Sequence, residues 1–123
     1  MGAHPKNRQK KTTIEPYTGE LPPWPDSIGK RKKILTITGE VQYFVITDEI
    51  RHIQYDYKKK LIVFQKLQLE GKQVTEYRLG YYMIGEKPGA RGRWVWGQFC
   101  LFIPAKDLKV ILKKAGKRGW LNL

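Results

Sequence analysis

The chain has 123 residues, 41% of them hydrophobic, and its 24 Lys and Arg against 11 Asp and Glu give a formal net charge of +13. This length fits one domain with a real core, which excludes wholesale disorder, and the charge favours a polyanionic partner such as DNA or RNA. No apolar run reaches the roughly 18 residues of a membrane span, and residues 1–11 are basic with no apolar segment behind them, so the protein is expected to be neither membrane-bound nor secreted.

Residues 1–33 are expected to form a basic, proline-rich arm that is only partly ordered, ahead of a single domain at 34–123. Most of the prolines lie in this segment, and proline lacks the N–H donor that helices and sheets require. Trp24, between Pro23 and Pro25, is expected to pin the arm onto the domain. The arm ends in consecutive cations at 30–33, a pattern typical of a phosphate-binding patch, a nuclear address or a solvated junction.

The middle of the chain alternates polar and apolar residues and is rich in β-branched and aromatic ones, which predicts strands. Their expected ranges are 34–38, 41–47, 50–57, 61–69, 73–84 and 93–103, with a tight hairpin turn at 70–72. A helix is predicted over 104–115, because Pro104 suits a first turn and Gly116 suits a stop. Strands followed by one helix indicate an α+β fold: an antiparallel β-sheet of about five to six strands with one C-terminal amphipathic helix packed on it.

Side-chain alternation in the last three strands predicts two sheet faces of different composition. The odd-numbered positions are expected to form a common core face: Leu61, Val63, Leu67, Leu69, Tyr77, Leu79, Tyr81, Met83, Val95, Phe99, Leu101 and Ile103. The even-numbered positions then form a second face that mixes aromatic and basic groups: Phe64, Lys66, Arg78, Tyr82, Trp94, Trp96 and Gln98. The sequence leaves open whether this second face meets solvent, or is covered by the arm or by another subunit.

Aromatic rings interleaved with cations are the most informative functional signal. Single-stranded nucleic acids are held by a basic groove along their backbone and by bases that stack on exposed rings. The two tryptophans at 94 and 96 point to one side of a strand, and the glycine-rich loop at 85–92 adds cations but lacks the pattern of a nucleotide P-loop. The candidate contacts in this part of the chain are Arg78, Tyr82, Lys87, Arg91, Arg93, Trp94 and Trp96.

The predicted helix carries a stripe of lysines on a different side from its apolar residues. Most of the charge excess lies in this region and in the arm, and concentrated charge is typical of an electrostatic contact surface for phosphates. The candidate phosphate contacts here are Lys106, Lys109, Lys113, Lys117 and Arg118. The absence of a recognition helix argues against sequence-specific reading of a duplex. The predicted function is non-enzymatic binding of nucleic acid, with single-stranded DNA or RNA as the expected ligand.

Two other functions fit parts of the sequence. Asp56, followed by Glu70 and Lys72, has the order of groups found in metal-dependent nucleases, in which carboxylates hold magnesium beside a lysine, although 70–72 also fits a hairpin turn. His52 lies near acidic residues and is an alternative general base for RNA cleavage. The second alternative is a basic adaptor that recruits another protein through its arm or a sheet edge.

The remaining motifs restrict cofactors and cellular location. No zinc-ligand spacing and no dinucleotide or kinase signature is present, so no metal and no cofactor is expected. Cys100 is the only cysteine, which excludes an internal disulfide and fits a reducing compartment, cytoplasmic or nuclear. A sheet edge or the aromatic face could also join two copies of the chain into a homo-oligomer.

Overall fold

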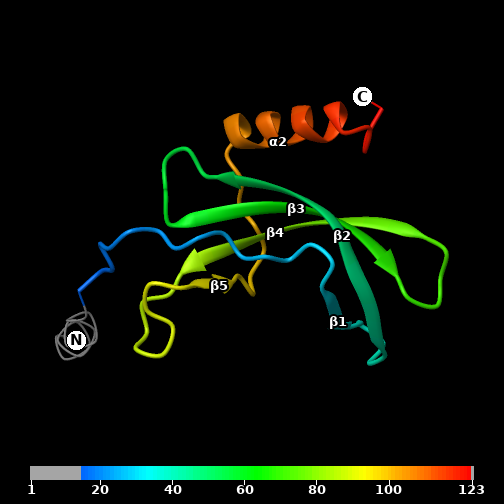
Figure 1. Cartoon of the computed structure of the whole chain (residues 1–123), viewed down its shortest axis with the longest axis horizontal. Helices are drawn as coiled ribbons and strands as arrows, with labels where there is room; N and C mark the ends of the chain where they lie inside the picture. The colour runs from blue at the N-terminus through cyan, green and yellow to red at the C-terminus, as the bar shows by residue number, and fades with distance from the viewer. Residues whose placement is uncertain (1–14, 123) are drawn as a thin grey trace, which may run out of the picture.

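The computed structural model describes residues 15–122 and shows the α+β fold that the sequence predicted. Five strands form one curved antiparallel sheet in chain order, and a helix lies across one of its faces (Figure 1). The elements are β1 (Arg31–Leu35), β2 (Val41–Ile53), β3 (Lys60–Leu69), β4 (Thr75–Ile84), β5 (Trp94–Trp96) and α2 (Ala105–Lys117). The predicted hairpin turn joins β3 to β4, where Gly71 has a positive φ of 77° that favours glycine.

Several predicted strands differ in extent from the observed ones, as the range 34–38 does from β1 (Arg31–Leu35). The ranges 41–47 and 50–57 belong largely to one strand, β2, and a bulge at Thr47 interrupts its pairing with β3 between Ile46 and Asp48. The strand predicted at 93–103 ends at Trp96, because the chain turns away from β4 after Gly97 and runs toward α2. Phe99, in this connection, is 83% exposed, so it does not contribute to a core face.

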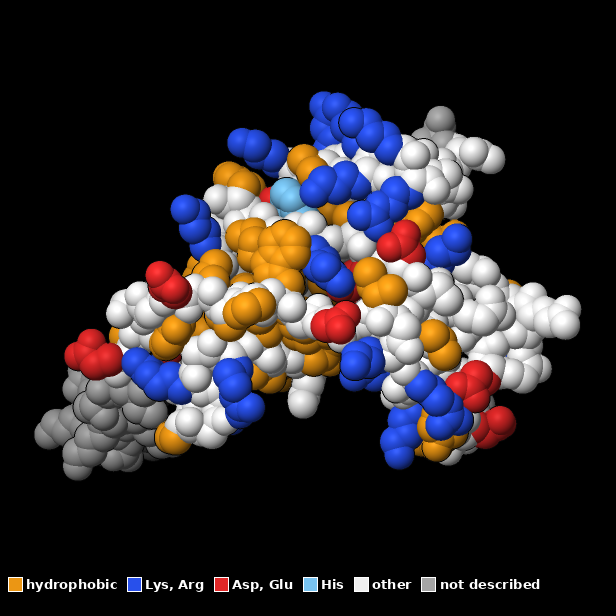
Figure 2. Space-filling model, viewed as in Figure 1, with side chains coloured by type: hydrophobic (Ala, Val, Ile, Leu, Met, Phe, Trp, Pro, Cys, Tyr) orange, Lys and Arg blue, Asp and Glu red, His pale blue; other side chains and the backbone are white. Residues whose placement is uncertain are grey.

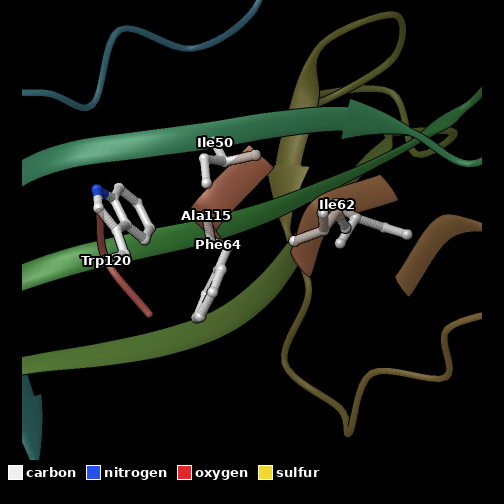
Figure 3. Packing of buried hydrophobic residues seen from close by; sticks show 6 residues of the cluster. Ile50, Ile62, Phe64, Ala115 and Trp120 are labelled. Atoms are coloured by element: carbon white, nitrogen blue, oxygen red, sulfur yellow. The ribbon is translucent and has the colours of Figure 1, made fainter. Parts of the chain in front are cut away.

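The main hydrophobic core lies between α2 and the sheet (Figure 3). Its buried members are Ile50, Ile62, Phe64, Ile111, Ala115 and Trp120. The chain reverses after α2 because Gly119 adopts a φ of +75°, and the Trp120 N–H then donates to the Ala115 carbonyl at 2.9 Å. This return places Trp120 edge to face with Phe64, at 5.4 Å between ring centroids. No helix within residues 15–122 is both long and apolar enough to cross a membrane.

The pairing registers overturn the predicted common core face. Odd positions of β3 lie opposite even positions of β4, as Leu61 lies opposite Tyr82, whereas β4 and β5 pair even with even. Residues directly opposite each other share a face of the sheet. Phe64 and Lys66 therefore lie on the side of α2, and the other face carries the odd residues of β3. That second face also carries Arg78, Tyr82, Trp94 and Trp96, as predicted.

The described part of the arm, residues 15–30, crosses the sheet face opposite α2. The Trp94 indole N–H donates to the Pro22 carbonyl at 3.1 Å, and the Ser27 and Tyr82 hydroxyls lie 3.4 Å apart. Ser27 is buried, whereas Trp24 is 45% exposed, so the expected pinning role belongs to the residues on either side of Trp24. Residues 31–33, predicted as the end of the arm, are the first three residues of β1, and residues 1–14 lie outside the described part.

Candidate nucleic-acid interface

The candidate site is the sheet face opposite α2, which we call the groove face and which carries Phe44, Leu67, Arg78, Tyr82 and Trp96. Trp96 lies across Gly80 of the neighbouring strand, so closely that a Cβ at position 80 would come within 2.3 Å of the indole. The Tyr82 ring meets the Trp96 ring edge to face at 5.1 Å between centroids. Glycine at position 80 therefore lets a large ring lie on the sheet surface, where Trp96 is half-buried.

Arg78 lies between two aromatic rings of the groove face. Its guanidinium carbon is 4.8 Å from the Phe44 ring centroid and 4.6 Å from that of Trp96. The Arg78 Nε donates to Gln65 at 2.7 Å, and the Gln65 amide donates to the buried Glu49 carboxylate at 2.5 Å. Burial lowers the pKa of Arg78, although an arginine remains charged in proteins. The cation is thus held in one orientation beside the indole.

An open groove of about 320 Å³ runs along this face from the β1–β2 hairpin to Arg78. Phe44, Leu67 and Leu69 are buried among its lining residues and form an apolar floor, while Lys72 is exposed. Glu76 is the acidic residue of the lining. The other part of the face, around Tyr82 and Trp94, is covered by the arm. The groove therefore combines an apolar floor with two cations. The Trp96 ring lies outside this lining and adjoins the groove through Arg78.

The cations of the 85–92 loop and its flank are largely occupied within the molecule. Arg91 donates to the Glu15 carbonyl at 2.8 Å and lies 3.4 Å from the Glu86 carboxylate, and Arg93 donates to the Gly89 carbonyl. A hydrogen bond from the Tyr17 backbone N–H, together with the nearby cations, lowers the pKa of Glu86. Lys87 is exposed. This loop is consequently an anchor for the arm as well as a candidate contact.

The predicted lysine stripe is exposed on α2, on the opposite side of the sheet from Trp94 and Trp96. Figure 2 shows Lys and Arg side chains gathered over the helix. All four lysines of the stripe are exposed, namely Lys106, Lys109, Lys113 and Lys117, and Lys114 beside them is exposed as well. Arg118 differs from them, because it donates to the Asp48 carboxylate and to the Glu49 carbonyl, each at 3.0 Å. The structure thus divides the predicted contacts between two surfaces that one straight strand cannot touch together.

The residues of the nuclease alternative are far apart. Asp56 precedes β3 and Glu70 follows it, so the length of the ten-residue strand, about 33 Å, separates them. Glu70 pairs with Arg31 at 2.5 Å, and this hydrogen bond lowers the pKa of Glu70. Within residues 15–122, no three His, Cys, Asp or Glu side chains form a group that could hold a metal ion.

His52 has a partner that the sequence did not indicate. Its Nε2 lies 2.6 Å from Oδ1 of Asp107, a fully buried carboxylate in the first turn of α2 that also accepts the Tyr55 backbone N–H at 3.0 Å. The two residues are 55 positions apart in the chain, so no local motif reveals the pair. Because Asp107 joins β2 and the following turn to α2, the pair fixes the position of the helix on the sheet.

Comparison of the chain with protein-family models, curated proteins and solved structures finds no match. The function is therefore inferred from the chain's own residues.

Proposed function

We propose that the protein binds single-stranded nucleic acid in the groove on the face opposite α2. The observation that carries this proposal is the position of the Arg78 guanidinium, 4.6 Å from the Trp96 ring at the end of an open groove. Proteins that bind single strands combine cations for the phosphates with rings on which bases stack. A duplex hides its base faces, so an aromatic surface of this kind favours an unpaired strand.

The state of the lysines supports a polyanionic ligand. Within residues 15–122, Lys59 is the only lysine that lies within 4.0 Å of a carboxylate. The surface carboxylates that form ion pairs do so chiefly with arginines, as Glu70 does with Arg31 and Asp48 with Arg118. The lysine ammonium groups consequently remain available for phosphates, and release of counterions from the nucleic acid favours such contacts.

The proposed mode of binding is independent of sequence. Lys72 and Arg78 meet backbone phosphates along the groove, while a base stacks against the exposed part of Trp96. The apolar floor supplies contact area without hydrogen-bond readout, so every base is tolerated. The lysines of α2 form a separate basic surface that a strand reaches only by passing around a sheet edge.

Replacing Trp96 with alanine tests the proposal. Loss of the ring is expected to weaken binding of a single strand about tenfold or more, since stacking contributes about 1–3 kcal/mol per base. The same change is expected to lower the free energy of unfolding by about 2 kcal/mol, less than a full core truncation, because the ring is only half-buried. Binding is measured by tryptophan quenching or fluorescence anisotropy with single-stranded DNA, RNA and duplex DNA in parallel.

Trp24→Ala is the matched control, because Trp24 is exposed on the arm, whereas Trp96 lies beside the Arg78 guanidinium of the groove. This variant is expected to keep both affinity and stability. A Trp96→Ala protein that loses stability but binds single strands as tightly as the wild type would contradict stacking in the groove.

A further inference from the structure

The β1–β2 hairpin ends in an exposed aliphatic side chain that no core explains. Ile37 is fully exposed at the apex, and Leu35 and Ile34 on the shaft are 68% and 50% exposed. Long, exposed apolar strand edges invite aggregation and are normally avoided, so a projecting apolar hairpin indicates an interaction surface. Figure 1 shows this hairpin extending away from the body of the sheet, on the side away from α2.

The apex is held rigidly. The Gly39 N–H donates to the Thr36 carbonyl at 2.9 Å, and the Thr36 N–H donates to the Glu40 carbonyl at 2.7 Å. The hydroxyls of Thr36 and Thr38 lie 3.0 Å apart, and Gly39 takes a φ of +89° that closes the turn. These bonds leave Ile37 as the one apolar side chain projecting from a polar turn.

Cations lie behind the apex. Arg31, Lys32 and Lys33 belong to β1, and Lys33 lies two residues before the end of the strand at Leu35. Arg31 stacks on Tyr43 at 3.9 Å, whereas neither Lys32 nor Lys33 has a carboxylate within 4.0 Å among the described residues. In Figure 2 basic, acidic and apolar side chains lie together at this end of the molecule. The hairpin thus presents an exposed apolar side chain at its apex and basic side chains on the strand behind it.

The hairpin adjoins the proposed strand-binding groove. Ile34 and Thr36 line the same groove as Arg78, and the Ile34 position lies on the groove face beside Phe44. A strand that occupies the groove and leaves it at the end opposite Arg78 therefore passes the hairpin. If that strand continues into a duplex, the apex meets the last base pair.

We propose that the β1–β2 hairpin is a wedge that places Ile37 against or between the terminal base pairs of a duplex, and that the preferred substrate is a junction between single-stranded and duplex nucleic acid. The inference rests on the proposed function, because the groove holds the single-stranded side of the junction. Isoleucine is among the apolar residues that proteins insert between base steps to unstack them. Lys32 and Lys33 then contact phosphates of the duplex arm.

A lipid surface fits the hairpin less well than a base stack. One myristoyl chain gives only marginal, reversible membrane binding, and a single apical isoleucine buries far less apolar area. The threonines and Glu40 around the apex would have to enter the membrane with it. A base step, by contrast, accepts one aliphatic side chain between polar flanks.

The test compares the wild type with Ile37→Thr, which keeps the branched Cβ and the charge but makes the apex polar. Fluorescence anisotropy is recorded with an oligonucleotide of about 16 nucleotides, with the same strand joined to a duplex arm, and with the arm alone. The wild type is expected to bind the junction about tenfold tighter than the single strand, and Ile37→Thr to lose this preference while keeping single-strand affinity. A 2-aminopurine at the junction, whose fluorescence rises on unstacking, is expected to brighten with the wild type only.

Leu35→Thr is the matched control. Leu35 is exposed on the shaft of the hairpin, and its position lies on the face that points away from the groove. It is expected to keep the junction preference. Normal single-strand binding without a junction preference, or an equal loss of preference in both variants, overturns the wedge and leaves the proposed function standing. Absence of single-strand binding overturns both. Binding of the wild type to phosphatidylserine vesicles that Ile37→Thr abolishes, with no junction preference, identifies the hairpin as a membrane contact and also overturns the wedge.

Discussion

Within residues 15–122 of this strongly basic chain, two carboxylates are buried, and each joins parts of the fold that are distant in the chain. Glu49 receives the Gln65 amide at 2.5 Å and the Arg51 Nε at 2.7 Å, and this network orients Arg78 in the groove. Asp107 receives His52 and the Tyr55 backbone N–H at the start of α2. Burial of a carboxylate is tolerated when its oxygens accept hydrogen bonds. Both donors to Asp107 meet Oδ1, and Oδ2 has no hydrogen-bond partner among the described residues. The sequence could not predict these partners, because they meet only after the sheet and helix have assembled.

Asp107→Ala tests the structural role of the second carboxylate. The change leaves His52 Nε2 and the Tyr55 N–H without their acceptor in a buried site, which is expected to lower the free energy of unfolding by about 3 kcal/mol. Asp56→Ala removes an exposed carboxylate from the same region and is expected to change stability by less than about 0.5 kcal/mol. Urea denaturation compares the two variants. Equal stability of both would show that Asp107 does not hold the helix in place.

At the scale of elements, alternation along a strand predicted which residues of one strand share a face, but not how neighbouring strands align. Trp96 and Tyr82 were predicted to share a face, and the even-to-even register of β4 and β5 places them opposite each other. Phe64 was assigned to that face and lies on the other, because the turn after β3 pairs odd positions with even ones. The bulge at Thr47 changes the phase once more within β2. The alternation of polar and apolar residues along a strand does not predict the length of the turn that follows it or the position of a bulge.

The helix illustrates the same limit. Its lysine stripe was predicted and is exposed, yet the helix pattern does not state which sheet face it covers. The buried residues of α2 are Asp107, Ile111 and Ala115, whereas the apolar residues Leu108 and Leu112 are only partly buried. The apolar pattern of the helix does not predict that an aspartate is buried. Asp107 is buried because its hydrogen-bond donors come from β2 and the turn that follows it. Because α2 packs on one face of the sheet, its lysines lie on the opposite side of the sheet from Trp94 and Trp96.

Single lysine substitutions distinguish the two basic surfaces. Lys72→Gln removes a cation from the groove and is expected to reduce the magnitude of the slope of log K against log salt by about 0.7, the value for one phosphate contact of a single strand. Lys113→Gln removes an equally exposed cation from α2 and is expected to leave the slope unchanged. Titrations of a single strand over a range of salt concentrations measure both slopes. A larger effect of Lys113→Gln would place the strand on the helix instead.

On the scale of the whole molecule, the sheet is covered on one face by α2 and partly on the other by the arm (Figure 1). Leu61 and Val63, on the face opposite α2, have no exposed surface, and the Tyr82 position opposite Leu61 meets Ser27 of the arm. The sequence indicated an extended arm but not its path, since a proline-rich segment has no periodicity that assigns it to a surface. The arm therefore sets the boundary between the covered and the open parts of the groove face.

Truncation of the arm tests this arrangement. A chain that begins at Leu21 loses the Tyr17 N–H bond to Glu86 and the Tyr17 ring beside Gly92, and is expected to lose only about 1 kcal/mol of stability. A chain that begins at Gly29 also loses Pro22 and Ser27 and uncovers part of the apolar face, which is expected to cost at least about 3 kcal/mol if two aliphatic side chains become exposed. Both truncations remove residues 1–14, so their difference reports only residues 21–28. Thermal unfolding measures the transition temperature of each chain. Equal transition temperatures would show that residues 21–28 lie on the sheet without stabilising it.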